Sequence, residues 1–415
     1  MVEVPASLEA LCALVRSNPP LAALRIRTTG VSAVLHNESV NVETAVLRFA
    51  LPSPHPRAAD WLASSLRTNT CLRELDLHGM NISDLSIAAL ARALTEGQVA
   101  ALDLSCNRAG PAAAAALAAL MATPSTLKVL NLNHNYVGNA GAETLSEGVA
   151  KSTLTSLFLA QNGVGEEGIV YLTFAIGQTS LTDIHLSGNV FRGVVGRFAN
   201  AVKASAINSL HAGDCALGDE GGVSMATILE TSPRLTSLHL WGNELEDASA
   251  VAMANALASN RAMTWLSLRR NAIGDDGARA LGDALKINVA LLTLDLAGNR
   301  IAESGVRSLC EALREQERLT ELDIAGNSFS GTADGEASSS LVSLLRDNTT
   351  LTSLNLAENA IKPSACLQIA AALEANTSIG AVYLSAASLG AEGMEMLTSD
   401  SASHFWESRV HVVAS

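Results

Sequence analysis

The sequence predicts an α/β solenoid, a horseshoe in which one parallel sheet lies on the inside and helices lie on the outside. Three observations predict it. A short motif with alternating leucines recurs along most of the chain. Between its copies, apolar residues follow a helical spacing. The chain is also 48% hydrophobic but only 3% aromatic, whereas one large core in 415 residues would hold more of the aromatic side chains that bury most area.

The alternating L-x-L of each motif predicts a short strand with one buried face. From residue 72 to residue 379 the copies follow one another in steps of 26 to 32 residues, most of them 27 or 28. Degenerate copies begin near Leu21 and Thr44. Eight clear copies start at Leu127, Leu154, Leu181, Leu235, Met263, Leu291, Leu319 and Leu351, and weaker ones start at Leu72, Val99, Ile207 and Ile379.

An asparagine follows nearly every predicted strand, and Cys215 replaces it in one copy. Buried polar groups must find hydrogen-bond partners, so we expect these side chains to stack between repeats and bind the backbone of each bend. The residues are Asn107, Asn135, Asn162, Asn189, Asn243, Asn271, Asn299, Asn327 and Asn359.

The second half of each copy predicts a helix, and the ends of the chain are typical of caps. We expect an N-terminal helical cap with degenerate repeats over 1–71, the repeats over 72–397, and a C-terminal cap over 398–415. Residues 5–18 favour an amphipathic helix that ends at Pro19 and Pro20. Residues 407–413 favour a last edge strand. The one long step, from 319 to 351, carries a polar insertion that predicts a surface loop.

The pattern L-x-x-L-x-L-x-x-N-x-L/I resembles the leucine-rich repeat, and its length and helical half are similar to the ribonuclease-inhibitor-like subfamily. The resemblance covers roughly residues 20 to 415. True ribonuclease inhibitors are cysteine-rich, and six cysteines argue against that activity. The Ran GTPase activators share the repeat and supply an early exposed arginine and an acidic tail. Here only Arg108 stands in a suggestive early loop, and Asp400 and Glu407 are the only acids after Leu397.

Composition excludes several classes of function. A formal net charge of -14 disfavours nucleic-acid binding. The longest strongly apolar run, 110–122, is too short to span a membrane. The cysteines form no C-x-x-C pair, so they favour reduced thiols in the cytoplasm over a metal or disulfide framework. We expect no cofactor and no catalytic residues, because no constellation of nucleophile, base and acid stands out.

One motif imitates a dinucleotide site. Gly163, Gly165 and Gly168 form G-x-G-x-x-G between a strand and a helix, with Asp183 twenty residues beyond Gly163. The same glycine spacing recurs in register in other copies, which favours turn residues entering each helix. Glu166 and Glu167 stand where a phosphate would bind and would repel it.

The fifth position of each copy lines the predicted concave face, and equivalent positions stack about 4.8 Å apart. Three consecutive copies place His185, His211 and His239 there. A straight ladder gives a poor tetrahedral arrangement, so we expect a partner-facing polar surface and no metal. Phe158 precedes the three histidines in the same column.

The strongest candidate patch lies beside that ladder. Trp241, at the seventh position of its copy, should stack against Arg269 as a cation–π pair, with Trp265 and Arg270 next to them. Tryptophan and arginine are enriched in binding hot spots. We therefore expect Trp241, Trp265, Arg269, Arg270, Phe158 and the three histidines to contact a partner.

The favoured function is a non-enzymatic scaffold or adaptor that binds a protein partner through its concave face, because solenoids present extended surfaces. The alternative is a structural subunit of a larger complex, a cytoskeletal or ciliary/axonemal assembly. A GTPase-activating protein that resembles the Ran activators is a third reading. The expected location is the cytoplasm, and the structural alternative implies association with the cytoskeleton or a cilium. The expected partners are proteins, and we expect neither nucleic-acid binding nor membrane insertion.

Overall fold

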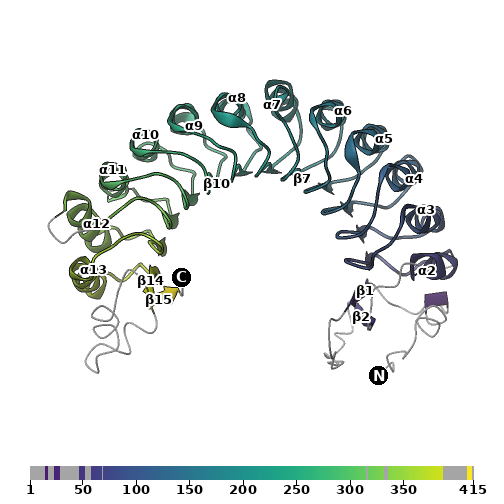
Figure 1. The fold of residues 1–415 in the computed structure, drawn as a ribbon, viewed down its shortest axis with the longest axis horizontal. Helices are drawn as coiled ribbons and strands as arrows, with labels where there is room; N and C mark the ends of the chain where they lie inside the picture. The colour runs from purple at the N-terminus through teal and green to yellow at the C-terminus, as the bar shows by residue number, and fades with distance from the viewer. Residues whose placement is uncertain are drawn as a thin grey trace. The chain divides into compact units, whose positions relative to one another are not determined.

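The computed structural model describes residues 15–16, 23–28, 46–51, 58–67, 69–314, 316–330, 335–386 and 409–413. The chain divides into two compact units, Met1–Ile207 and Asn208–Ser415. Each unit alternates strands with helices, and its helices lie on one side of a parallel sheet (Figure 1). We call the side of each sheet opposite the helices the inner face of that unit. Each unit is a solenoid of the predicted α/β class.

In the first unit, strands β3 to β7 pair in chain order, but the N-terminal strands do not follow that rule. Strand β1 lies between β2 and β3, so β2 forms the edge of the sheet. The strands of this unit are β1 (Ala23–Thr28), β2 (Val46–Leu51), β3 (Glu74–Asp76), β4 (Ala101–Asp103), β5 (Val129–Asn131), β6 (Ser156–Phe158) and β7 (Asp183–His185).

The described helices of the first unit follow its strands one by one from β2 onward. They are α2 (Ala58–Leu66), α3 (Asp84–Ala93), α4 (Pro111–Met121), α5 (Gly138–Ala150), α6 (Glu166–Ile176) and α7 (Val195–Ala204).

The second unit repeats the arrangement, and its strands β8 to β15 pair in chain order. They are β8 (Ser209–His211), β9 (Ser237–His239), β10 (Trp265–Ser267), β11 (Thr293–Asp295), β12 (Glu321–Asp323), β13 (Ser353–Asn355), β14 (Ala381–Ser385) and β15 (Val410–Val413). The helices are α8 (Gly218–Thr231), α9 (Asp247–Ser259), α10 (Asp275–Leu285), α11 (Glu303–Leu313), α12 (Glu336–Asp347) and α13 (Pro363–Ala375).

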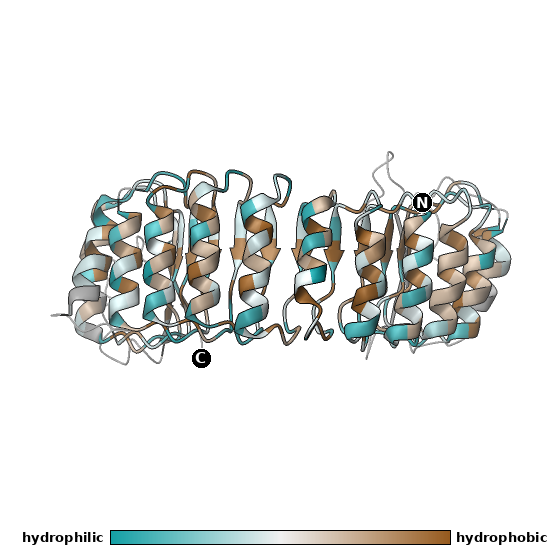
Figure 2. Cartoon of the chain, turned by 90° about the horizontal axis from the view of Figure 1, so that it is seen from above, coloured by the Kyte–Doolittle hydropathy of each residue, from teal (hydrophilic) through white to brown (hydrophobic). Residues whose placement is uncertain are grey.

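The core of each unit lies between sheet and helices. The middle residue of each strand from β3 to β13 is an aliphatic side chain with almost no exposure, such as Leu75, Leu130 and Leu238. Most helices bury one apolar side, and hydrophobic and hydrophilic colours alternate along them in Figure 2. The mainly aliphatic core also holds aromatic rings. Phe191 and Phe198 are both buried, and their rings meet edge to face with centroids 4.8 Å apart.

The predicted asparagine ladder is confirmed. The side-chain amide of Asn299 donates to the carbonyl oxygens of Leu268 (3.0 Å) and Leu296 (2.8 Å), and its oxygen accepts the backbone N–H of Ile273 (3.1 Å). The other asparagines make equivalent contacts in their own repeats, and most of them are buried. Each side chain therefore joins the bend of its own repeat to the bend of the preceding repeat.

A second row of buried amides, which the sequence reasoning missed, lies where helices turn into strands. Asn260 donates to the carbonyl oxygen of Leu229 (2.6 Å) and accepts the backbone N–H of Met263 (2.7 Å). Asn288, Gln316, Asn348 and Asn376 repeat this arrangement. The sequence does carry this signal, because a side-chain amide recurs three residues before the first residue of these copies of the motif.

The ends of the chain are described only in part. Of the helix predicted over 5–18, residues 15–16 are described and helical, whereas Pro19 and Pro20 lie outside the described residues. Strands begin near both degenerate copies, as β1 and β2. The last strand, β15, pairs with β14 in register from Val410, opposite Val382. The middle of the polar insertion, 331–334, lies outside the described residues, and α12 begins just after it.

Candidate functional site

The fifth-position column lies in register within each unit, as predicted. In the first unit Asp76, Asp103, Asn131, Phe158 and His185 occupy equivalent places on β3 to β7. In the second unit the column runs from His211 on β8 through His239, Ser267, Asp295, Asp323 and Asn355 to Tyr383 on β14. These side chains are buried or partly exposed, so the inner faces are lined by semi-exposed polar and aromatic groups.

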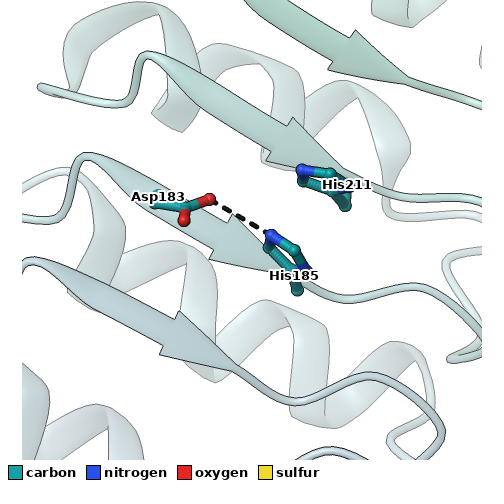
Figure 3. A group of neighbouring side chains, drawn as sticks. All are labelled: Asp183, His185 and His211. Atoms are coloured by element: carbon teal, nitrogen blue, oxygen red, sulfur yellow. Dashed lines mark ion pairs between the residues drawn. The ribbon is translucent and has the colours of Figure 1, made fainter. Parts of the chain in front are cut away.

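On the first unit, Phe158 and His185 form one contact. Their rings meet edge to face with centroids 4.4 Å apart. The Nε2 atom of His185 also lies 3.3 Å from a carboxylate oxygen of Asp183 on the same strand (Figure 3). Protonation of His185 would make this contact an ion pair. The structure thus brings together two of the predicted site residues and adds Asp183, which the sequence reasoning considered only as part of a nucleotide motif.

On the second unit, three rings lie next to one another on neighbouring strands, and the first two of them stack. His211 and His239 are nearly parallel, with centroids 4.0 Å apart and planes 10° apart. Trp265 lies over His239 at 5.8 Å, tilted by 38°. The Oγ of Ser237 lies within hydrogen-bonding distance of Nε2 of His239, at 2.9 Å. We call His211, His239 and Trp265 the aromatic row. Trp265 ends it and keeps 43% of its surface exposed.

Trp241 lies against the backbone of the preceding repeat. A Cβ atom built on Gly213 would overlap the indole ring of Trp241. A glycine at the seventh position of one copy therefore makes room for the tryptophan of the next. Trp241 is only partly exposed as a result.

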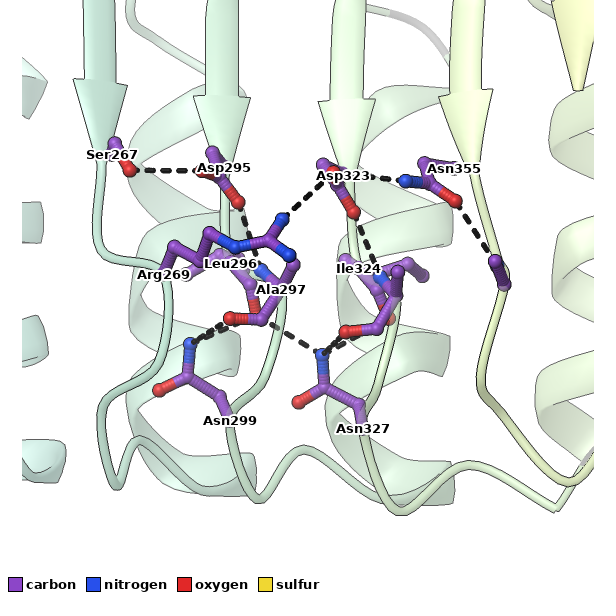
Figure 4. Close-up of polar contacts among 12 residues, drawn as sticks. Ser267, Arg269, Asp295, Leu296, Ala297, Asn299, Asp323, Ile324, Asn327 and Asn355 are labelled. Atoms are coloured by element: carbon purple, nitrogen blue, oxygen red, sulfur yellow. Dashed lines mark hydrogen bonds and ion pairs between the residues drawn. The ribbon is translucent and has the colours of Figure 1, made fainter. Parts of the chain in front are cut away.

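The predicted cation–π pair between Trp241 and Arg269 is wrong, because Arg269 extends in the opposite direction. Its Nη1 atom lies 3.6 Å from Oδ2 of Asp323, across the intervening strand β11 (Figure 4). A carboxylate attracts a guanidinium more strongly than a ring face does. Small residues at the seventh positions that follow, Ala297 and Ala325, leave space for the arginine to cross.

Arg270 is exposed and adopts a left-handed backbone conformation, with φ of 53°. Its side chain leaves the strand along the backbone of Gly298, where an added Cβ would lie 3.2 Å from Cγ of Arg270. Both arginines therefore extend toward the following repeats, whereas Trp241 lies in the preceding one.

Two carboxylates continue the column beyond the aromatic row, and we call Asp295 and Asp323 the carboxylate row. Asp295 accepts the hydroxyl of Ser267 at 2.9 Å, and Asp323 accepts the side-chain amide of Asn355 at 3.0 Å (Figure 4). Burial is the main cause that raises the pKa of Asp323, and the charge of Asp295 adds to it. Hydrogen bonds and Arg269 oppose this rise without cancelling it.

These two carboxylates were not among the candidate residues that the sequence suggested. The signal that could have singled them out was the run Ser267, Asp295, Asp323, Asn355 at one position. Two adjacent acids between neutral hydrogen-bonding residues predict a carboxylate pair that is poorly neutralised.

The glycine motif near residue 163 belongs to turns, as predicted. Gly163 has φ of 66°, and Gly165 begins helix α6. The side-chain oxygen of Asn139 accepts the backbone N–H groups of Gly165 (2.7 Å) and Gly168 (3.3 Å). The donors that a phosphate would need at this helix N-terminus are therefore already used.

Comparisons with known proteins agree with the repeat architecture. A family described as Leucine Rich repeat matches residues 123–146, 259–282, 288–310 and 347–370. The ribonuclease inhibitor of Sus scrofa is 31% identical over 145 residues, which are 33% of this chain and 32% of that protein. The match thus spans about a third of the relative's length.

Two solved structures are similar at low scores. An internalin from Listeria monocytogenes aligns with a TM-score of 0.44 and 19% identity, over 69% of this chain and 75% of that one. Actin-binding site 2 of leiomodin-1 aligns with a TM-score of 0.32 and 22% identity, over 37% of this chain and 87% of that one. Separately, none of the helices in the described part of the chain has an apolar stretch long enough to cross a lipid bilayer.

Proposed function

We propose that this chain, which is a leucine-rich-repeat protein of the ribonuclease-inhibitor-like subfamily, is a non-enzymatic scaffold or adaptor that holds a protein partner on its inner faces. The observation that carries the proposal is the aromatic row with its exposed end, Trp265. Aromatic anchors of this kind dominate the binding energy of protein interfaces. Repeat solenoids present them on extended surfaces.

Further support comes from how each inner face is held. The rings of Phe158 and His185 contact each other, those of His211 and His239 stack, and Trp265 lies tilted beside His239. Side chains that are already fixed in the free protein lose little conformational freedom on binding. The inner face therefore offers a partner a preorganised surface of rings, hydroxyls and carboxylates.

The experiment that tests the proposal compares two alanine variants in affinity capture from cells that express the chain. Trp265→Ala removes the exposed ring of the inner face, whereas Phe174→Ala removes a ring that is 69% exposed on helix α6. Circular dichroism and thermal melting first establish that both variants fold. We expect the partner captured by the wild type and by Phe174→Ala to be lost or strongly reduced with Trp265→Ala.

Equal capture by all three chains would sink the proposal. The same extracts also address the alternative of a permanent structural subunit. A chain that elutes only within a large complex, and resists release at high salt, would favour a cytoskeletal or ciliary assembly. A chain that elutes freely and captures its partner on demand would favour the adaptor.

A further inference from the structure

We propose that the inner face of the second unit binds a cationic segment of its protein partner, rich in arginine or lysine, and that Arg269 occupies the place of that segment in the free chain. The inference rests on the proposed function and specifies the partner's chemistry. The receiving groups are Trp265 and the carboxylate row, Asp295 and Asp323.

The first support is the position of Arg269. Its guanidinium leaves its own repeat and reaches Asp323 two strands away, so a guanidinium is the group that this part of the face already holds. The contact is loose, because Nη1 and Oδ2 are 3.6 Å apart and Arg269 keeps 49% of its side chain exposed. Paired guanidinium and carboxylate groups reach about 2.7–2.9 Å when hydrogen-bonded. An arginine from a partner has a better geometry available than Arg269 has.

The second support is the shortage of positive charge around the carboxylate row. Asp295 and Asp323 are neighbours in the column, and Arg269 is the only cation with an ion pair to either among the interactions recorded for the described residues. Burial is the main cause that raises the pKa of Asp323, the charge of Asp295 adds to it, and Arg269 opposes the rise without cancelling it. An added cation would therefore gain electrostatic energy.

The third support is the row beside it. Trp265, Thr293 and Glu321 occupy equivalent third positions on β10, β11 and β12, and the hydroxyl of Thr293 lies 3.4 Å from Glu321. Trp265 and Glu321 are thus about 10 Å apart across two strand spacings. A ring face attracts guanidinium and ammonium groups. Successive basic side chains of an extended segment can meet the tryptophan at one end and the carboxylates at the other.

The test measures binding of an acetylated, amidated tetra-arginine peptide to the intact chain by titration calorimetry. A peptide of the same length with citrulline in place of arginine is the neutral control. We expect the arginine peptide to bind and the citrulline peptide to bind at least tenfold more weakly. Asp295→Asn combined with Asp323→Asn should weaken arginine-peptide binding about tenfold. Asp276→Asn combined with Asp283→Asn removes the same charge from exposed positions on α10 and should have little effect.

The decisive variant is Arg269→Ala, because it removes the competing guanidinium. We expect it to tighten peptide binding about three- to tenfold more than Arg279→Ala, which removes the same charge from helix α10. Equal or weaker binding by Arg269→Ala than by Arg279→Ala would overturn the inference, and so would equal binding of both peptides. If these arms fail while Trp265→Ala still loses the captured partner, the proposed function stands without this partner chemistry. If the peptide-binding results are as expected but Trp265→Ala captures the partner as well as the wild type does, the surface binds cations and the proposed function fails.

Discussion

Each buried asparagine of the inner ladder joins two neighbouring repeats through one side chain, and this is the strongest local signal of the fold at the residue scale. Asn243 is fully buried and contacts the carbonyl oxygens of Ala212 and Leu240 and the backbone N–H of Cys215. Cys215, in the copy that lacks the asparagine, is also buried, and its thiol donates to the carbonyl oxygen of Gly213 at 3.3 Å. A thiol has one hydrogen to donate, whereas a side-chain amide has two and also a strong acceptor oxygen.

Asn299→Ala is expected to lower the free energy of unfolding by about 2–4 kcal/mol, because it leaves two buried carbonyl groups and one buried N–H without their partner. Urea unfolding monitored by circular dichroism measures the change. The control is Asn208→Ala, which replaces an exposed asparagine of the second unit that lies outside the ladder. Its free energy of unfolding should stay within about 0.5 kcal/mol of wild type. Similar losses for both variants would contradict the role of the ladder.

Asp323→Asn is expected to stabilise the fold at pH 7, where the aspartate is charged. Burial raises the pKa of Asp323, so the charged form costs stability at neutral pH, and that cost fades as pH falls through the raised value toward the ordinary 3.8. The stabilisation should therefore be present at pH 7 and vanish near pH 3. Unfolding curves across this range measure it. A gain that grows as pH falls would have the wrong sign and would refute the explanation.

At the scale of elements, an aspartate in the first turn of one helix caps the next helix. Asp219 of α8 accepts the hydroxyl of Ser249 and the backbone N–H groups of Glu246 and Ser249, both at 2.9 Å, at the start of α9. Burial alone would raise the pKa of Asp219, but these bonds lower it below its usual value. The capping residue thus comes from the neighbouring repeat, and none of these helices is capped by a side chain at its own N-cap position.

Two adjacent aspartates of α10 give a matched test of this capping. Asp275 accepts the backbone N–H groups of Ala302 (2.7 Å) and Gly305 (2.9 Å) at the start of α11, whereas Asp276 is exposed and pairs with Arg279. We expect Asp275→Ala to cost about 1–2 kcal/mol of unfolding free energy and Asp276→Ala less than about 0.5 kcal/mol. Hydrogen exchange at the amides of Ala302 and Gly305 should accelerate only in Asp275→Ala. Equal effects of the two substitutions would rule out the cap.

Close packing between helices reverses the usual effect of replacing a helical glycine. A Cβ on Gly148 in α5 would lie 2.5 Å from Cα of Ala118 in α4, whereas a Cβ on Gly196 in α7 would meet nothing within 4 Å. We expect Gly148→Ala to destabilise by about 1–3 kcal/mol through the forced separation of α4 and α5. Gly196→Ala should stabilise by up to about 1 kcal/mol through helix propensity. Thermal melting measures both effects. A higher melting temperature for both variants would contradict the close packing of α4 against α5.

At the scale of the whole molecule, one repeat builds both units, and the division between them coincides with irregularities of the sequence. The shortest step, 26 residues, separates Leu181 from Ile207, and the second unit begins at the copy in which Cys215 replaces asparagine. The formal charge of -14 belongs to the entire chain. A field of that sign speeds the approach of positively charged partners and repels negatively charged ones.

Binding of the tetra-arginine peptide is expected to weaken about tenfold between 0.05 M and 0.5 M NaCl, because salt shortens the range of the field and screens exposed carboxylates. Calorimetric titration at four salt concentrations measures the effect. The citrulline peptide carries no side-chain charge, so any binding that it shows should change little. An arginine-peptide affinity that does not depend on salt would exclude an electrostatic contribution.

The sequence by itself determined the strand and helix of each repeat, the asparagine ladder and the register of the fifth-position column. The reason is periodicity: a fixed step repeats the same local environment, so one well-understood copy predicts the others. The sequence also placed Trp265 beside the histidine column, because the register follows from the repeat. The contact of Trp265 with His239 is diagonal, since Trp265 pairs with Ser237.

Only the tertiary structure decided where the long side chains point and which N-terminal strand meets β3. Arg269 turns to Asp323 and away from Trp241, an outcome that depends on competition between a ring one strand away and a carboxylate two strands away. Strand β1, not β2, pairs with β3. Neither choice repeats with the period, so no other copy could reveal it. Both follow from contacts between residues far apart in the chain, whose energies local sequence patterns do not encode.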